Sequence, residues 1–196
     1  MMRTFIFGFI LVFMWACSDN NSVLPKPRIY PRVIYPDKNY KLQAFQDCPF
    51  GMMIPEYFVS IKDTFSEEGP KNKCWFDLYS QNFDAYLHLS YIDIGNRKHF
   101  DKLMSDAFEL ADKHNIKASF RDEIKINKPE KDLHGILFEI EGPVATPLQF
   151  FVTDSTNHFM RGSLYFKSQV NRDSIAPIYE FLREDSVALL DSYSWK

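Results

Sequence analysis

The sequence predicts an α+β fold in which an antiparallel β-sheet is flanked by helices, an αβα sandwich. Three observations predict this fold. A β-hairpin stands near the C-terminus, the elements run as three strands, a helix, four strands and a helix, and the first helix carries one apolar stripe. Of the 196 residues, 45% are hydrophobic and 25% are charged, which is typical of one globular domain.

The hairpin spans residues 147–166. Two runs of alternating side chains, 148–153 and 159–166, flank a polar break at residues 154–157. Both sides of each run carry large aromatic residues, so we expect a central pair of strands in a sheet that is covered on both faces. Gly162 leaves room for a close neighbour.

Three predicted strands precede the first helix, at residues 57–65, 74–79 and 85–94, and polar or Gly-Pro turns separate them. Asn96 is expected to cap a helix over residues 97–114. Apolar residues recur at helical spacing along that helix and form the stripe that faces the sheet.

The second half of the predicted sheet begins with a strand at residues 116–126, a turn at 127–132 and a strand at 135–141. The hairpin follows. A final helix is expected after residue 171, with Pro177 in its first turn, where a missing N–H costs nothing. This order of elements is similar to that of the Mog1/PsbP-like fold, a similarity of shape alone.

The composition excludes several classes of function. A formal net charge of -3 gives no electrostatic basis for nucleic-acid binding. The sequence contains no CxxC or Cys/His ligand spacing, no Gly-rich phosphate loop, no Walker motif and no EF-hand loop. We therefore expect no cofactor and no metal site.

Residues 1–16 are predicted to be a lipoprotein-type signal peptide. Arg3 precedes an apolar run at residues 5–15 that is too short to span a membrane as a stable helix. Cys17 follows Ala16, an arrangement that resembles a bacterial lipoprotein signal, in which the cysteine is acylated, with palmitate for example, and becomes the new N-terminus. An uncleaved anchor or a plain signal peptide is the alternative, and either would export the body of the protein.

The exported chain is predicted to consist of a stalk and one domain. Residues 17–41 are rich in proline and form the stalk, and residues 42–196 form a single α+β domain. Cys48 and Cys74 remain as an even pair. Outside the cytosol such a pair usually closes a disulfide, and two buried free thiols are the alternative.

The hairpin turn gathers residue types that serve in catalysis, namely Asp154, Ser155 and His158, with Arg161 nearby. Catalytic triads assemble from separated segments, however, and no GxSxG motif is present. The structural expectation is a set of turn hydrogen bonds together with an ion pair between Arg161 and Asp154. The functional expectation is a surface that these four residues present to a partner or a ligand.

Short motifs stand in one order along nearly the whole chain: Lys26-Pro27-Arg28, Cys48-Pro49-Phe50, Cys74-Trp75, Leu89-Ser90-Tyr91, Gly135-Ile136-Leu137, Thr153-Asp154-Ser155, His158-Phe159, Arg161-Gly162, Leu164-Tyr165-Phe166 and Trp195-Lys196. On these motifs the chain resembles the gliding motility lipoprotein GldD family.

The resemblance implies a cell-envelope lipoprotein that is required for gliding motility and is linked to the type IX secretion system. It implies a lipid anchor at a membrane, a domain that faces the periplasm, and other envelope proteins of the gliding machinery as partners. The family brings no catalytic residues, so we expect no enzyme activity. The alternative is an envelope enzyme or a small-ligand-binding domain that uses Asp154, Ser155 and His158.

Overall fold

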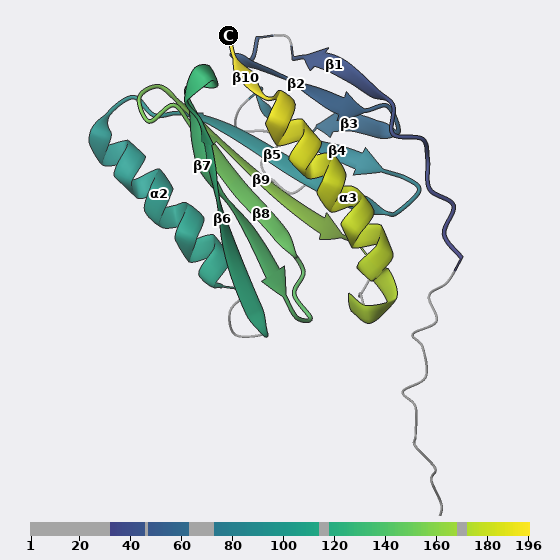
Figure 1. Ribbon diagram of the computed structural model, residues 1–196. Coiled ribbons are helices and arrows are strands. Elements are labelled where there is room, and N and C mark those ends of the chain that lie inside the picture. The colour runs from purple at the N-terminus through teal and green to yellow at the C-terminus, as the bar shows by residue number, and fades with distance from the viewer. Residues whose placement is uncertain (1–31, 46, 63–72, 114–117, 168–171) are drawn as a thin grey trace, which may run out of the picture.

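The computed structural model describes residues 32–45, 47–62, 73–113, 118–167 and 172–196, with the backbone alone at 172–173. Two antiparallel sheets and two long helices make up this part of the chain (Figure 1). The elements are β1 (Tyr40–Ala44), β2 (Phe50–Pro55), β3 (Phe58–Lys62), β4 (Trp75–Ser80), β5 (Ala85–Asp93), α2 (Arg97–Asp112), β6 (Phe120–Lys128), the 3-10 helix η1 (Pro129–Lys131), β7 (Leu133–Glu141), β8 (Leu148–Thr153), β9 (His158–Phe166), α3 (Arg172–Ser192) and β10 (Ser194–Trp195).

The larger sheet has seven strands in the order β3-β4-β5-β9-β8-β7-β6, and its neighbouring strands are antiparallel. These are the seven strands predicted from the sequence. The hairpin of β8 and β9 lies inside this sheet, as predicted. Phe150 and Phe151 are adjacent on β8 and so point to opposite faces, yet only 1% and 2% of each is exposed. Both faces are therefore covered at the hairpin.

The two helices cover opposite faces of the larger sheet, which confirms the αβα sandwich (Figure 1). Helix α2 packs Phe100 and Leu103 against the face that carries Phe151. Helix α3 packs Leu182 into the cluster that contains Phe150. The predicted cap of α2 is present, because the Asn96 side chain accepts the backbone N–H of residue 99 at 2.9 Å.

A second sheet, β1-β2-β10, was not predicted. Its central strand is apolar on both sides, without the alternation that marks a half-exposed strand. Phe50, Met52 and Ile54 of β2 are almost fully buried, in the same core as α3. The small sheet therefore extends the core on the α3 side.

Two expectations at the ends of elements differ from the structure. Strand β6 runs to Lys128, so the expected turn at 127–132 is confined to η1 and Asp132, whose φ of 48° is left-handed. Helix α3 begins at Arg172, which places Pro177 beyond the first turn, where its ring removes one hydrogen bond of the helix. Residues 63–65 of the first expected strand, residue 114 of the first helix and residues 116–117 of the fourth expected strand lie outside the described residues.

The end of the expected stalk packs on the domain. Val33 contacts the core, the Tyr35 ring lies 4.9 Å from the Phe181 ring of α3, and β1 already begins at Tyr40. The signal peptide, Cys17 and the first part of the stalk lie outside the described residues. Neither of the two described helices is long and apolar enough to cross a membrane.

Candidate functional site

The turn between β8 and β9 is organised by one carboxylate. Oδ1 of Asp154 accepts the backbone N–H groups of Thr156, Asn157 and His158 at 3.0, 2.8 and 2.8 Å. Ser155, between them, has a left-handed φ of 66°. The predicted turn hydrogen bonds are therefore present, and they come from Asp154 because a short carboxylate reaches backbone donors a few residues ahead.

These hydrogen bonds set the charge state of Asp154. Burial alone would raise the pKa of this carboxyl group, but the backbone N–H donors of residues 158, 156 and 157 outweigh burial and hold the pKa below 3.8. Asp154 is only 8% exposed, and its carboxylate is ionised at neutral pH. Its Oδ1 atom is thus hydrogen-bonded to the backbone of its own turn.

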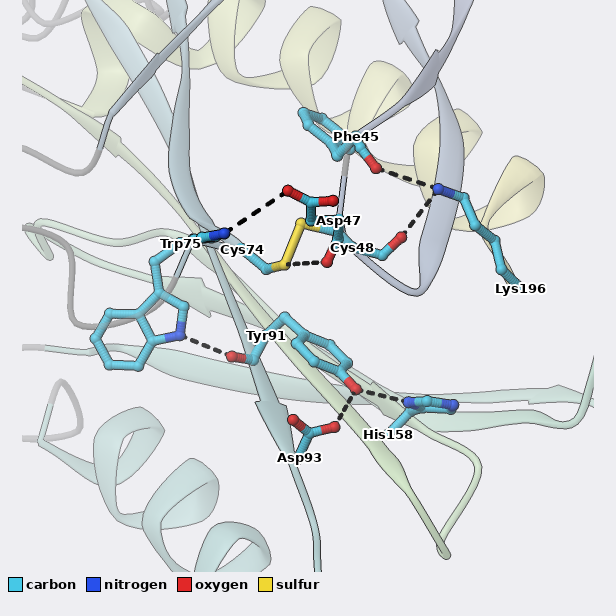
Figure 2. Close-up of a disulfide and its surroundings, with 10 residues drawn as sticks. Phe45, Asp47, Cys48, Cys74, Trp75, Tyr91, Asp93, His158 and Lys196 are labelled. Carbon is cyan, nitrogen blue, oxygen red and sulfur yellow. Dashed lines mark hydrogen bonds and ion pairs between the residues drawn. A yellow bond between two sulfur atoms is a disulfide. The ribbon is translucent and has the colours of Figure 1, made fainter.

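His158 lies at the start of β9 and contacts residues far away in sequence. Its Nδ1 is 2.7 Å from the hydroxyl oxygen of Tyr91, and that hydroxyl donates to Asp93 at 2.7 Å (Figure 2). The hydroxyl of Tyr91 has one proton, which it donates to Asp93. The hydrogen bond between Tyr91 and His158 is therefore donated by the N–H at Nδ1 of His158. Burial and then the bond to Asp93 raise the pKa of Tyr91, so this hydroxyl stays protonated. The Trp195 ring stacks on His158 with a centroid distance of 5.0 Å.

Arg161 lies on the opposite face of β9 from His158, three residues further on. Burial lowers the pKa of its guanidinium, and the charge of Asp106 on α2 partly offsets this effect. The expected ion pair between Arg161 and Asp154 is therefore absent: the alternation of the strand separates the two side chains, and the Asp154 carboxylate is already bonded to its own turn.

The four predicted site residues thus separate into three places. Asp154 lies within the turn, His158 lies under Trp195, and Arg161 faces α2. Ser155 is exposed at the tip of the turn together with Thr156 and Asn157. Among the hydrogen bonds of this turn, none joins Ser155 to His158 or His158 to the Asp154 carboxylate through side chains, so the three do not form a proton relay of the triad type.

A groove opens beside the turn, on the α2 face of the sheet. Its volume is about 300 Å³, and the side chains that line it come from α2, β6, β7, β8 and the turn. The floor is mainly apolar, and of the polar lining residues only Ser155 belongs to the site predicted from the sequence. The lining residues are Phe100, Met104, Glu123, Lys125, His134, Gly135, Ile136, Phe151, Thr153 and Ser155.

A disulfide joins Cys48 and Cys74, as predicted, with their Cα atoms 5.7 Å apart (Figure 2). It ties the residues before β2 to the start of β4. The ammonium group of Lys196 donates to the backbone oxygens of Cys48 and Phe45 at 2.9 and 3.1 Å, so the C-terminal strand is held at the same place. The backbone N–H of Tyr91 reaches Cys74 O at 3.3 Å, which links this corner to the His158 contacts.

Within the described ranges, His, Cys, Asp and Glu side chains form no group of three that could hold a metal ion. The expectation of no metal site rests on the sequence and stays a prediction.

Comparison with known proteins gives the family. The fold is similar to that of a solution structure of cyanobacterial PsbP (CyanoP) from Synechocystis sp. PCC 6803, with a TM-score of 0.48 and 6% sequence identity over 82% of this chain and 95% of that chain. No protein of curated function matches the sequence. Residues 20–195 match the family model described as gliding motility lipoprotein GldD. The chain therefore belongs to the gliding motility lipoprotein GldD family.

Proposed function

We propose that this gliding motility lipoprotein is an accessory or assembly component of the gliding machinery, linked to type IX secretion, that acts by contacting other envelope proteins. Membership of the family supports the role in gliding. The observation that carries the rest is the turn between β8 and β9. Its tip is exposed and its backbone is fixed, which are the properties of a surface that presents side chains to a partner.

The contact surface in this proposal is the turn tip, Ser155, Thr156 and Asn157. All three residues are exposed, and the three backbone hydrogen bonds to Asp154 hold their positions. A fixed loop loses little conformational entropy when a partner binds. Asp154 and His158 support this surface from below, and Arg161 lies outside it.

The proposal also places the domain outside the cytoplasm, in the periplasm, on a lipid anchor at Cys17. The disulfide between Cys48 and Cys74 supports an oxidising compartment, because cytosolic thiols are kept reduced. The contacts of Val33 and Tyr35 with the domain leave residues 17–32 as the tether between the anchor and the folded body.

A charge placed on the turn tip tests the proposal. In a gliding bacterium that lacks its own copy of the protein, Thr156→Arg should abolish gliding while the variant accumulates normally with its disulfide formed. The matched control is Val59→Arg, at a position that is 56% exposed on the far edge strand β3, and it should glide like the wild type.

A photo-crosslinking amino acid at the same two positions identifies the partner. Position 156 should yield crosslinks to components of the gliding or secretion machinery, identified by mass spectrometry, and position 59 should not. Normal gliding of Thr156→Arg would show that the contact surface lies elsewhere.

The groove favours a second candidate, the binding of a small, largely apolar ligand. Phe100, Met104, Ile136 and Phe151 supply the apolar floor, and Ser155 lies at its rim. Met104→Trp should fill the groove. If that variant loses gliding while Thr156→Arg retains it, the ligand-binding role replaces the contact role.

A further inference from the structure

Strand β6 is an unpaired edge of the larger sheet. It is hydrogen-bonded to β7 on one side, and no described strand pairs with its other side. It is nine residues long, and an edge of this length has a row of backbone donors and acceptors that can pair with another strand. In the single chain one of these donors, the N–H of Glu123, is bonded to the exposed carboxylate of Asp122 at 2.9 Å, and pairing would replace that bond. Phe120 and Ile124 on this strand are 58% and 37% exposed.

The side chains of β6 divide cleanly between the two faces of the sheet. Ile124 pairs with Leu137, which belongs to the α3 side, and Glu123 pairs with Phe138, which belongs to the α2 side. Phe120, Ile124 and Ile126 therefore share the α3 face. Glu123 and Lys125 share the α2 face, where they form one wall of the groove.

We infer that β6 pairs with β6 of a second copy of this chain, antiparallel and centred on Ile124. Residue 124 is the midpoint of Phe120–Lys128, so this register overlaps the whole strand. It brings each Glu123, which also contacts Arg121 of its own strand at 2.7 Å, opposite the second copy's Lys125, twice across the axis. On the other face it brings the two Ile124 side chains together.

The charge pattern selects this register over its neighbours. In a two-fold antiparallel pair, residues that face each other must lie on the same face, so the axis passes through a residue. Centring the pair on Asp122, Glu123 or Lys125 would place two like charges directly opposite each other, which is destabilising. Charges on edge strands commonly prevent pairing. Here they oppose the registers centred on Asp122, Glu123 and Lys125 and support the one centred on Ile124. A register centred on Ile126 has no like charges opposite each other, but it would pair only residues 124–128 of the strand.

Pairing through β6 would give a symmetric dimer with one two-fold axis. The axis stands perpendicular to the sheet, so the α2 faces of both copies, with their grooves and Ser155 rims, open on the same side. Lipid anchors in one membrane raise the effective concentration of the two copies. The contact along a single pair of strands is then enough to hold the dimer together. The inference is independent of the proposed contact at the turn.

Cysteine crosslinking of the full-length protein in its membranes tests the pairing. On the axis, the two residues at position 124 have Cβ atoms about 4.5–5.5 Å apart, close to the distance that a disulfide needs. Under mild oxidation, Ile124→Cys should form a crosslinked dimer at least about tenfold faster than Val59→Cys, an exposed control on the opposite edge strand. Equal rates, or no dimer, would overturn the inference.

Charge reversal tests the register in the Ile124→Cys background. Lys125→Glu should reduce crosslinking at least about fivefold, because each Glu123 then faces a glutamate. Adding Glu123→Lys restores opposite charges across the axis and should restore crosslinking. The double variant has the same composition as the parent, so a failure to restore dimer formation in protein with its native disulfide would refute the Ile124-centred register.

Discussion

A single glycine illustrates how closely the hairpin is packed. Gly162 on β9 pairs with Phe150 on β8, and a Cβ atom built on this glycine would lie 2.2 Å from Cζ of the Phe150 ring. No side chain fits there unless the ring moves. The room that the sequence suggested at Gly162 is therefore occupied by the aromatic ring of the neighbouring strand.

Gly162→Ala should destabilise the domain by about 1–3 kcal/mol, the usual cost of overpacking a buried site. The measurement is the urea midpoint of unfolding, with an unchanged dependence on denaturant. Gly51→Ala is the matched control, because a Cβ atom at that strand position meets its nearest neighbour, the backbone oxygen of Gln43, at an ordinary 3.7 Å. Equal midpoints for the two variants would contradict this account of the site.

At the scale of elements, the β8–β9 turn depends on one ionised group. Because the pKa of Asp154 is lower in the folded chain than its usual 3.8, its contribution to stability is present above that value and is lost as the pH falls through the folded pKa. At pH 7, Asp154→Ala should lower the free energy of unfolding by about 1–3 kcal/mol, the cost of leaving buried donors without an acceptor.

The difference between wild type and Asp154→Ala should shrink as the pH falls below about 4, where the wild-type carboxylate becomes protonated. Urea unfolding of both proteins at several values of pH measures it. Asn157→Ala changes an exposed side chain of the same turn and should show a small effect without this dependence on pH. A difference that stays constant down to pH 2 would mean that the charge of Asp154 does not hold the turn.

Elements with a clear periodicity of apolar residues could be predicted from the sequence, and elements without one could not. The seven strands of the larger sheet alternate or lie between turn residues, and the apolar stripe of α2 follows a cap at Asn96. Strand β2 is apolar on both sides, β1 is mostly exposed and β10 has two residues, so none carries a periodic signal.

The candidate site was predictable only as far as local chemistry reaches. Asp154 binds the backbone of the next few residues, which sequence alone suggests. Tyr91 and Trp195, the partners of His158, come from distant parts of the chain. The groove also remained hidden, because its walls meet only through the strand order β8-β7-β6 and the position of α2.

At the scale of the whole molecule, a buried carboxylate holds the residues just before β1 and the start of that strand against the core. Asp185 of α3 is 1% exposed, and it accepts hydrogen bonds from the hydroxyl groups of Tyr40 at 2.5 Å and of Tyr57. The ammonium group of Lys38 lies 3.3 Å from the same carboxylate and 4.4 Å from the centre of the Phe181 ring. Burial and the bonds to Asp185 raise the pKa of both tyrosines, so they remain donors over the physiological range.

The segment before β1 is therefore held against the domain by side chains of α3. Asp185→Ala leaves the hydroxyls of Tyr40 and Tyr57 without their acceptor, and it should lower the free energy of unfolding by about 1–3 kcal/mol. Lys38 loses one contact and keeps two, because its ammonium group also donates to Glu184 at 2.6 Å and to the backbone oxygen of Phe181 at 3.3 Å. Trypsin should also cleave after Lys38 faster than in the wild type, because the segment loses its two tyrosine bonds to Asp185 and detaches more often while the rest of the domain stays folded.

The two readouts together identify the attachment. Asp191→Ala is the matched control, because it removes an exposed carboxylate from the same helix. The Asp191 carboxylate binds Lys128 and not Lys38, so cleavage after Lys38 should be unchanged. Mass spectrometry of the tryptic fragments measures the rate at each site. If Asp185→Ala lowers stability and leaves the rate at Lys38 unchanged, Asp185 serves the core alone. The segment is then held by the ion pair of Lys38 with Glu184 and by the contacts of Tyr35 with Phe83 and Phe181.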